Sequence, residues 1–480
     1  MNVILNNYFF SLSYQFLTIL IPLVTAPYLT RVLGAEGTGI YGYVHSLTSL
    51  ICSIVMLGVY GYGNRQIAYV RDNPRDLNDI FWRIISARIV IAIFGSIIYF
   101  IIIILVGRYR CYFYLYYTYL LGYFIDCTWL FVGVEDMKWA VLKNTLMKLL
   151  TVCGIFLFVK NRIDVGTYIF IQGGSILFAN LTAYSQLNRY VGKPNIDFSH
   201  LREDLFGSLL IFLPGIAQTL YLQCDKIMLE LLTNATEQVA QYDYAEKIVT
   251  IPLSFITVLS TVMMPRIANE FKKNHVEEIE ALLNKAAKFS VFLAFPLMFG
   301  MILIAGKMVP WYLGAEFSPT SKAICIISPI IVLNTLIGIS GGQYFTATNQ
   351  INLLLNAQIS AAVGNVVINA LLIPKYGYVG AAIATVIAST ICASVQYYHL
   401  IKQIRLPGLF GAGARYCVIS AGMYIIVRLL SGDMPPTPLS SVYQIVSGAI
   451  FYFVSCLLIK DEQFYSLIRM AKEMMKVWKK

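Results

Sequence analysis

The sequence is poor in charge and rich in long apolar runs. Only 13% of its 480 residues are charged and 58% are hydrophobic, whereas soluble domains carry about 25% charged residues. This composition leaves little sequence for a water-soluble domain. Residues 1–7 lack the basic segment and the small-residue cleavage site of a secretory signal, so we expect the first apolar run to remain in the protein.

Signatures of metal binding and ATP hydrolysis are also missing. The nine cysteines show no metal-ligand spacing, and the four histidines, at 45, 200, 275 and 399, are scattered. The segment from Gly300 to Lys307 approximates a phosphate-binding loop, but it has one residue too many and is followed by Met308 where Ser or Thr is needed. We therefore expect neither a metal site nor ATP hydrolysis in this chain.

Apolar stretches of membrane-spanning length follow one another along the whole chain. A helix needs about 20 residues to cross a hydrocarbon layer of ~30 Å. Short polar connectors separate fourteen such stretches, at 8–30, 38–62, 81–106, 112–133, 142–159, 165–187, 205–231, 241–264, 287–306, 322–347, 352–373, 378–400, 412–430 and 441–459. The sequence therefore predicts an all-α integral membrane protein with about 14 transmembrane helices.

The distribution of basic residues predicts the orientation of these helices. Placing the N-terminus in the cytoplasm puts 24 Lys and Arg residues in inner connectors and 9 in outer connectors. Because cytoplasmic loops carry the basic excess, we expect both termini in the cytoplasm. The same bias accounts for the net charge of +11, so no nucleic acid partner is expected. The amphipathic end should lie against anionic lipids of the inner leaflet.

A weak internal repeat suggests how the helices are grouped. Val32-Leu33-Gly34 with Tyr41-Gly42-Tyr43 is followed about 200 residues later by Leu231-Leu232-Thr233 with Tyr242-Asp243-Tyr244. Parallel repeats of this kind are typical of transporters. We predict an N-lobe at 1–190, a C-lobe at 200–405, two further helices at 406–460 and a cytoplasmic amphipathic tail at 461–480.

Several motifs resemble those of Wzx-type polysaccharide flippases. In the N-terminal half they are Pro27-Tyr28-Leu29-Thr30-Arg31-Val32-Leu33-Gly34 and Gly58-Val59-Tyr60-Gly61-Tyr62-Gly63-Asn64-Arg65. In the second half they are Asp225-Lys226, Tyr242-x-x-Ala245-x-Lys247-Ile248, Met264-Pro265-Arg266-Ile267 and Ile373-Pro374-Lys375-Tyr376-Gly377. The resemblance runs from the first span to about residue 405, and the last two spans match in hydropathy only.

This resemblance implies a fold and a function. The fold is that of the multidrug/oligosaccharidyl-lipid/polysaccharide (MOP) exporters, related to the MATE transporters, with two pseudo-symmetric six-helix lobes around a V-shaped central cavity. The implied function is to move an undecaprenyl-diphosphate-linked oligosaccharide across the bacterial inner membrane by alternating access, for O-antigen, capsule or exopolysaccharide assembly. Polymerases and glycosyltransferases of that route are the implied partners. Such carriers use no ATP, and some relatives couple to H⁺ or Na⁺.

Six basic residues are candidates for binding the diphosphate. A cation that faced lipid at mid-helix would be unfavourable by about 2.5–3.5 kcal/mol, so intramembrane cations should point inward. Guanidinium groups match phosphate oxygens in a fork geometry. The candidates are Arg31, Arg65, Arg88, Lys226, Lys247 and Arg266. Arg31, Arg65 and Arg266 lie at span ends, where they either anchor the topology or line the mouth of the cavity.

Three acids lie close to these bases, and each has two interpretations. Arg88 and Asp126 should have similar depth on neighbouring helices, either as an ion pair that fixes the helices or with Arg88 held for the substrate. Asp225 and Glu246 either pair with the adjacent lysines or bind a coupling proton or sodium ion.

Three other functions remain open at this stage. A lipid II flippase shares the lipid carrier, and a MATE-like small-molecule antiporter shares the fold. A membrane polysaccharide polymerase would need a long outer loop, but the longest outer connector is 307–321. The eight aromatic residues within 109–123 predict an interfacial belt, or alternatively a surface that stacks on sugars.

Overall fold

The computed structural model describes residues 2–56 and 58–478, and every regular element in these ranges is helical. Side chains are described except at 2–16, 19, 137, 139–140, 210–211, 213–218, 221, 258–262, 470–471 and 474–478. The chain forms two compact units, Met1–Ala240 (unit 1) and Gln241–Lys480 (unit 2). The predicted lobes at 1–190 and 200–405 remain a prediction, and residues 479–480 of the predicted tail lie outside the described residues.

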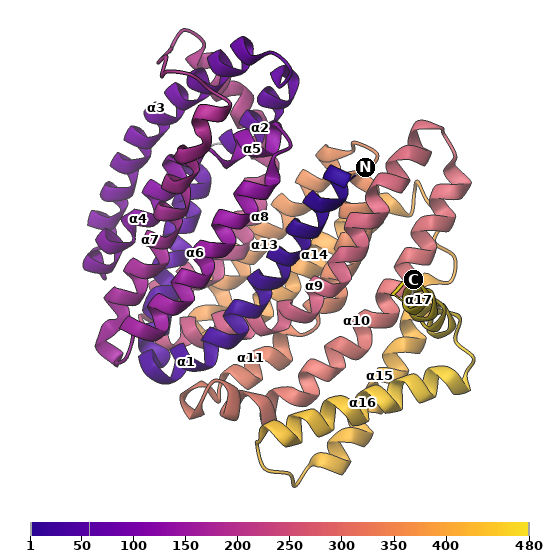
Figure 1. Ribbon diagram of the computed structural model, residues 1–480. Helices are drawn as coiled ribbons and strands as arrows, with labels where there is room; N and C mark the ends of the chain where they lie inside the picture. The colour runs from indigo at the N-terminus through magenta and orange to yellow at the C-terminus, as the bar shows by residue number, and fades with distance from the viewer. Residues whose placement is uncertain (1, 57, 479–480) are drawn as a thin grey trace. The chain divides into compact units, whose positions relative to one another are not determined.

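The helices of each unit follow one another with short connections (Figure 1). Unit 1 contains α1 (Asn2–Val55), α2 (Val59–Val70), α3 (Pro74–Val106), α4 (Arg110–Phe124), α5 (Thr128–Gly133), α6 (Met137–Phe158), α7 (Val165–Ala183) and α8 (Leu201–Thr233). Helix α9 (Thr236–Lys272) crosses the boundary between the units. Unit 2 continues with α10 (Val276–Tyr312), α11 (Thr320–Ile327), α12 (Ile330–Ile337), the π-helix Gly338–Phe345, α13 (Ile351–Tyr376), α14 (Tyr378–Leu400), α15 (Leu409–Ser431), α16 (Pro438–Leu458) and α17 (Glu462–Trp478).

Two glycines interrupt the first predicted spans. Gly34, with φ 71° and ψ −175°, breaks α1 where the sequence predicts the first outer turn. Gly58 has φ +72°, and a Cβ atom there would lie 2.8 Å from the carbonyl oxygen of Ser208 on α8. The close approach of α8 therefore requires glycine at this point, and it separates α2 from α1 inside the predicted span 38–62.

The described helices are those of a multi-pass membrane protein. Nine helical segments in the described ranges are long and apolar enough to cross a membrane. The remaining predicted spans coincide with α4–α5, α7, α8 and α9. From residue 89 to the end of α3, the exposed side chains are large and apolar: Ile89, Ile93, Phe94, Ile97, Ile98, Ile101, Ile104 and Leu105. Because a helix satisfies its own backbone hydrogen bonds, this face can lie in lipid.

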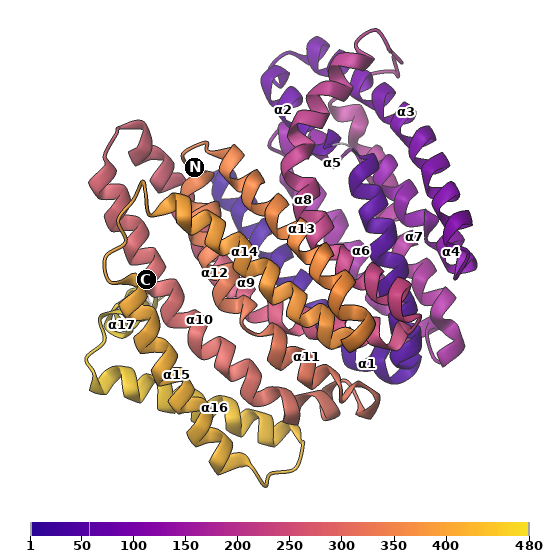
Figure 2. The ribbon, with the colours of Figure 1, turned by 180° about the vertical axis from the view of Figure 1, so that it is seen from behind.

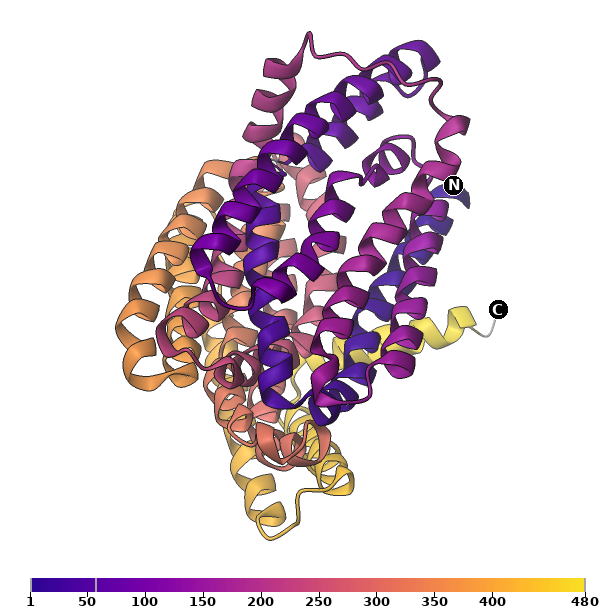
Figure 3. The same ribbon diagram turned by 90° about the vertical axis from the view of Figure 1, so that its left-hand side faces the viewer.

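Close helix packing positions the inner helices of unit 1. A Cβ atom at Gly173 of α7 would lie 2.4 Å from Oγ1 of Thr118 on α4, and one at Gly122 of α4 would lie 2.8 Å from the backbone nitrogen of Leu177. Small residues at such positions let membrane helices approach closely. Figure 3 shows that the segment 190–200, which leads into α8, crosses one end of this unit.

Unit 2 has an apolar core between α10, α15 and α16 (Figure 2). Phe292 of α10 lies at its centre and is fully buried, and its carbonyl oxygen accepts a 2.6 Å hydrogen bond from the hydroxyl of Tyr452. Helices α15 and α16, predicted from hydropathy alone, therefore pack as parts of this unit. In the same unit, α13 and α14 run next to each other and meet at Gly377, which has φ 55°.

Candidate functional site

The six predicted cations separate into two groups by exposure. Arg31, Arg65 and Arg266 are exposed, and the side chain of Lys247 is 49% exposed. Arg88 is only 2% exposed and Lys226 only 7%. An exposed cation can reach an anionic headgroup directly, whereas a buried one needs a rearrangement of its surroundings. The role of all six in substrate binding remains a prediction.

Arg88 holds the end of a helix. Its Nε donates to the carbonyl oxygen of Phe124 at 3.3 Å, and its Nη2 donates to the carbonyl oxygen of Tyr123. These carbonyls belong to the last turn of α4, whose groups have no partner within the helix. Nη1 is buried and has no hydrogen-bond partner among the described residues. Arg88 therefore caps α4 from α3.

Asp126 lies in the break that follows α4. The sequence predicts one span at 112–133, but the structure divides it into α4 and α5. The carboxylate of Asp126 accepts hydrogen bonds from the hydroxyl and the backbone nitrogen of Thr128, the latter at 2.9 Å, just before α5 begins. Within the described part of the chain, Arg88 and Asp126 form no salt bridge. Arg88 instead caps α4, and Asp126 holds the turn that leads into α5.

Lys143 is a buried cation that the sequence does not single out, because it lies at the very start of the predicted span 142–159 and is counted with the basic residues of the inner connector before it. It lies on α6 and is 4% exposed. Its ammonium group donates to the carbonyl oxygen of Ala179 and to Oδ1 of Asn180, both at 3.1 Å. Asn180 in turn donates to the carbonyl oxygen of Gly122 at 2.9 Å. Lys143 thus ties α6 to α7 and, through Asn180, to α4.

Lys247 pairs with Asp243, an acid that the sequence shows in the repeat motif but that is not among the predicted site residues. Its ammonium group lies 2.5 Å from the carboxylate of Asp243, one turn earlier on α9. Asp243 is only 4% exposed, so the salt bridge has a buried acid and a half-exposed base. The spacing of four residues, which puts both side chains on one helix face, is the signal that could have identified the pair. Glu246, predicted as the alternative partner, has an interaction of its own.

Asp225 and Lys226 lie in the C-terminal part of α8. Both are buried, and both have interaction partners. One turn further along, Glu230 is 2% exposed and its carboxylate lies 2.9 Å from Nη1 of Arg108, which follows α3. The sequence predicts Arg108 in an outer connector and gives no signal for this pair. It fixes the C-terminal end of α8 within unit 1.

The N-terminal end of α8 is held in a similar way. Asp204 is 1% exposed and lies 2.9 Å from Nη2 of Arg83 on α3. It also accepts a 2.8 Å hydrogen bond from the hydroxyl of Tyr62 on α2. Buried acids at both ends of α8 therefore connect it to the helices of unit 1.

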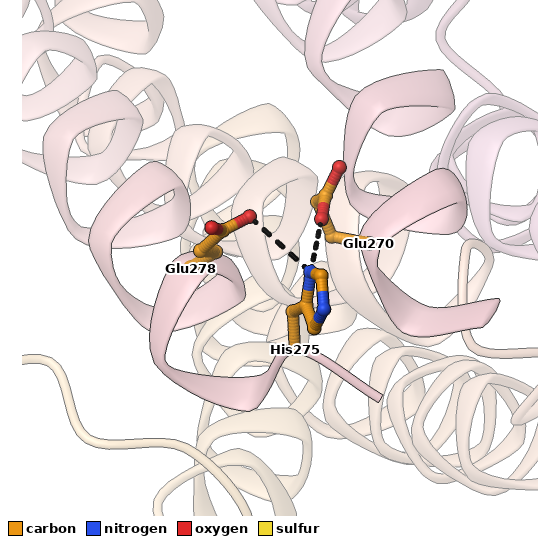
Figure 4. Close-up of side chains that lie close together, drawn as sticks. All are labelled: Glu270, His275 and Glu278. Carbon is orange, nitrogen blue, oxygen red and sulfur yellow. Dashed lines mark hydrogen bonds and ion pairs between the residues drawn. The ribbon is translucent and has the colours of Figure 1, made fainter. Parts of the chain in front are cut away.

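Arg266 lines an open pocket of about 370 Å³ at the connection between α9 and α10. Beside it, Glu270, His275 and Glu278 offer ligand atoms within 4.8 Å of one another (Figure 4). His275 Nδ1 lies 2.9 Å from Glu270 and 3.6 Å from Glu278. Lys273, 2.9 Å from Glu270, is the main cause that lowers the pKa of Glu270 to about 2, with His275 next. The cluster could hold a divalent ion, but Lys273 already supplies positive charge to it.

Comparison with known proteins identifies the family to which the chain belongs. Residues 4–271 match the model of a family described as polysaccharide biosynthesis protein. The chain belongs to this family. Residues 198–435 also match the model of Lipid II flippase MurJ.

Relatives of this polysaccharide biosynthesis protein extend over most of its length. A protein of Escherichia coli K12 named "Putative O-antigen transporter" is 25% identical over 78% of this chain and 92% of its own. A Haloferax volcanii protein named "Probable low-salt glycan biosynthesis flippase Agl15" is 22% identical over 68% of this chain and 70% of its own.

Solved structures show the same fold. The inward closed conformation of Lipid II flippase MurJ covers 95% of the chain with a TM-score of 0.71, at 17% identity and 99% coverage of its own chain. An inward-facing MATE transporter of the MOP superfamily covers 82%, with a TM-score of 0.66, 16% identity and 94% of its own chain. These structures confirm the predicted fold. The two family matches and the O-antigen transporter relative confirm the predicted membership of the MOP superfamily.

Proposed function

We propose that this polysaccharide biosynthesis protein is a flippase for an undecaprenyl-diphosphate-linked oligosaccharide. It moves the repeat unit from the cytoplasmic to the outer leaflet of the bacterial inner membrane by alternating access, without a chemical step on the substrate. The observation that carries this proposal is the match to the O-antigen transporter over 78% of this chain and 92% of that one. The family match and the apolar helices support it.

The exposed cations support a specific role in this reaction. A diphosphate cannot enter hydrocarbon without positive partners, and a half-exposed lysine or arginine can supply one without unpacking the protein. Arg31, Arg65, Lys247 and Arg266 are the candidates of this kind. Arg88 and Lys226 act on the substrate only in a conformation that exposes them.

The proposal also includes the orientation of the chain in the membrane, the pathway that its product enters and the source of energy for transport. Both termini lie in the cytoplasm, and the product feeds O-antigen, capsule or exopolysaccharide assembly by glycosyltransferases and a polymerase. The energy comes from an ion gradient, of H⁺ or Na⁺, and not from ATP. Asp126, Asp225 and Glu246 are the acids proposed from the sequence to bind or balance the coupling ion.

Depletion of the protein in its own host tests this function. We expect a diphosphate-linked oligosaccharide to accumulate on the cytoplasmic leaflet, where a glycosidase added to intact spheroplasts cannot reach it. Accumulation of single repeat units on the outer leaflet would contradict the proposal and indicate a polymerase instead.

A second candidate function is flipping of lipid II. The match of residues 198–435 to the MurJ family and the fold shared with MurJ favour it. Expression of the chain in cells depleted of their own lipid II flippase separates the two functions. Restored growth would favour lipid II, whereas continued lysis together with restored surface glycan in a glycan-flippase mutant would favour the oligosaccharide.

A further inference from the structure

A histidine lies at the middle of a membrane helix in unit 1. His45 belongs to the apolar part of α1 between the break at Gly34 and the end at Val55. Ionisable side chains at this depth are rare, and histidine is the one whose ordinary titration range includes neutral pH. Its ring is half-buried, so it is reachable from outside the packed core.

Tyrosines surround the imidazole. The ring of Tyr41, one turn earlier, stacks on it with centroids 5.6 Å apart and planes 19° apart. Tyr119 of α4 meets it edge-on at 5.6 Å, and Tyr116 at 6.0 Å. A stacked aromatic ring stabilises a cation above its face. The tyrosines, which titrate far above neutral pH, stay protonated while the histidine changes charge.

One hydrogen bond connects this histidine to the next helix. Nδ1 of His45 lies 2.8 Å from the hydroxyl oxygen of Tyr116, which is 1% exposed. When the imidazole is neutral with its proton on Nε2, Nδ1 accepts from the hydroxyl. When a proton binds at Nδ1, that nitrogen donates and the hydroxyl must accept. Proton binding therefore reverses the direction of the bond between α1 and α4.

Charged groups from other helices approach α1 on both sides of His45. Glu230 and Arg108 interact with Tyr43, two residues before it, and Arg88 and Asp126 interact with Cys52, seven residues after it. Titratable groups on the packed helices include Tyr116 and Tyr119 of α4, Tyr168 of α7 against Tyr41, and Tyr99 of α3 against Thr48. The ring contacts and the hydrogen bond of the imidazole given above go to tyrosines, which can stabilise its charged form.

We propose that His45 is a proton-binding site of this carrier and that its protonation, transmitted through Tyr116, sets the packing of α1 against α4 during transport. H⁺ is then the coupling ion. His45 joins the three acids that the sequence predicts to bind or balance that ion. The coupling role depends on the proposed function, whereas proton binding at His45 does not.

A titration of the whole protein tests proton binding. The full chain, labelled with ¹³C and ¹⁵N at its four histidines and embedded in lipid nanodiscs, is titrated between pH 5 and 8 by NMR. His45→Gln identifies the His45 signal by its loss. We expect this signal to move from the neutral to the protonated position within that range. A signal that stays neutral throughout would overturn the proposal.

Two tyrosine variants test the role of the hydrogen bond. Tyr116→Phe removes the acceptor and should weaken proton binding by about tenfold. The matched control on the same helix is Tyr117→Phe, because the hydroxyl of Tyr117 lies 2.7 Å from Oγ of Ser96 instead. An equal shift in both variants would show that the contact with Tyr116 is not specific.

Surface glycan in a strain that depends on the chain tests coupling separately. We expect His45→Gln to lower surface glycan at least fivefold at unchanged protein level, and His399→Gln, at the end of α14, to leave it unchanged. Export by His45→Gln at the wild-type rate would overturn the coupling role. If the wild-type chain exports no glycan, the proposed function fails, while the titration still decides whether His45 binds a proton.

Discussion

Buried cations distinguish the two units: among the described residues they occur in unit 1 and not in unit 2. In unit 1, Arg88 and Lys143 donate hydrogen bonds to neutral oxygens of neighbouring helices. In unit 2, the buried acids Asp243 and Asp461 are each paired with a cation whose side chain is 49% exposed, an arrangement that unit 1 also has in Glu230 with Arg108. The first arrangement joins helices, whereas the second leaves a positive group at the surface.

This difference separates structural cations from those available to a substrate. A buried cation that caps a helix end cannot leave without exposing unsatisfied carbonyls. A half-exposed lysine or arginine above a buried acid can share its charge with a second anion. We infer that residues such as Lys247 meet the diphosphate first, and that Arg88 keeps unit 1 folded.

The largest expected effect follows from neutralising Arg88. Arg88→Gln leaves the carbonyls of Tyr123 and Phe124 without their charged partner, which should destabilise the protein by about 2–5 kcal/mol. We expect the amount of protein in the membrane and its export activity to fall together, measured by quantitative blotting and surface glycan. The control is Arg110→Gln, an exposed arginine that bonds the carbonyl oxygen of Ile104. Loss of export at normal abundance would instead place Arg88 in the cavity.

The second prediction concerns the salt bridge between Lys247 and Asp243. Lys247→Gln should lower export about tenfold and also lower the melting temperature, because it removes the salt bridge to the buried Asp243. Adding Asp243→Asn should restore the melting temperature but not export. Recovery of both by the double variant would contradict a contact between Lys247 and the substrate.

A third prediction concerns the salt bridge between Asp461 and Arg415 in unit 2. This pair has no proposed contact with the substrate. Asp461 accepts from the hydroxyl of Tyr416 at 3.0 Å and from the backbone nitrogen of Gln463, so it both holds α15 and caps α17. Asp461→Ala should destabilise the start of α17 by about 1–2 kcal/mol, with faster proteolytic cleavage near residue 462. Asp461→Asn, which keeps the cap, should be cleaved more slowly than Asp461→Ala. Equal cleavage of the two variants would show that the cap does not stabilise α17.

The smallest effect is expected at the connection between α9 and α10. Lys273, and then His275, lower the pKa of Glu270 to about 2, so its charged contacts stabilise the protein above about pH 4.5 and are lost as the pH falls towards 2. Glu270→Gln should lower the melting temperature by only about 1 °C at pH 7, because the group is at the surface. The difference from the wild type should shrink between pH 4.5 and 3. A difference that grows with acid would contradict this assignment.

Hydropathy predicts much of the fold but not its interruptions. The spans 352–373, 378–400, 412–430 and 441–459 each coincide with one helix, because length and apolarity decide whether a segment crosses lipid. The break at Gly58 depends on the close approach of α8, which is distant in sequence, so no local pattern shows it. The break at Asp126 is accompanied by hydrogen bonds from Thr128, two residues further on, which hydropathy does not register.

The sequence predicts which cations are buried in the candidate site, but not which groups they pair with. Depth along the spans correctly indicated that Arg88 and Lys226 lie within the protein, since a lipid-facing cation is unfavourable. Lys143 lies one residue inside the predicted span 142–159, and hydropathy does not place the start of the helix, since α6 already begins five residues earlier, at Met137. The partner of Arg88 is a helix end and not Asp126, and the sequence does not show which backbone carbonyls are left without partners.

The most direct test of the central claim is transport by the purified chain in proteoliposomes. These carry a fluorescent undecaprenyl-diphosphate-linked oligosaccharide in both leaflets, and a membrane-impermeant quencher reports the outer fraction. We predict that the fluorescent lipid that starts in the inner leaflet becomes quenched at least tenfold faster with the wild-type chain than with the Lys247→Gln/Asp243→Asn variant or with empty liposomes. The same slow rate in all three samples, with correctly folded protein, would contradict it.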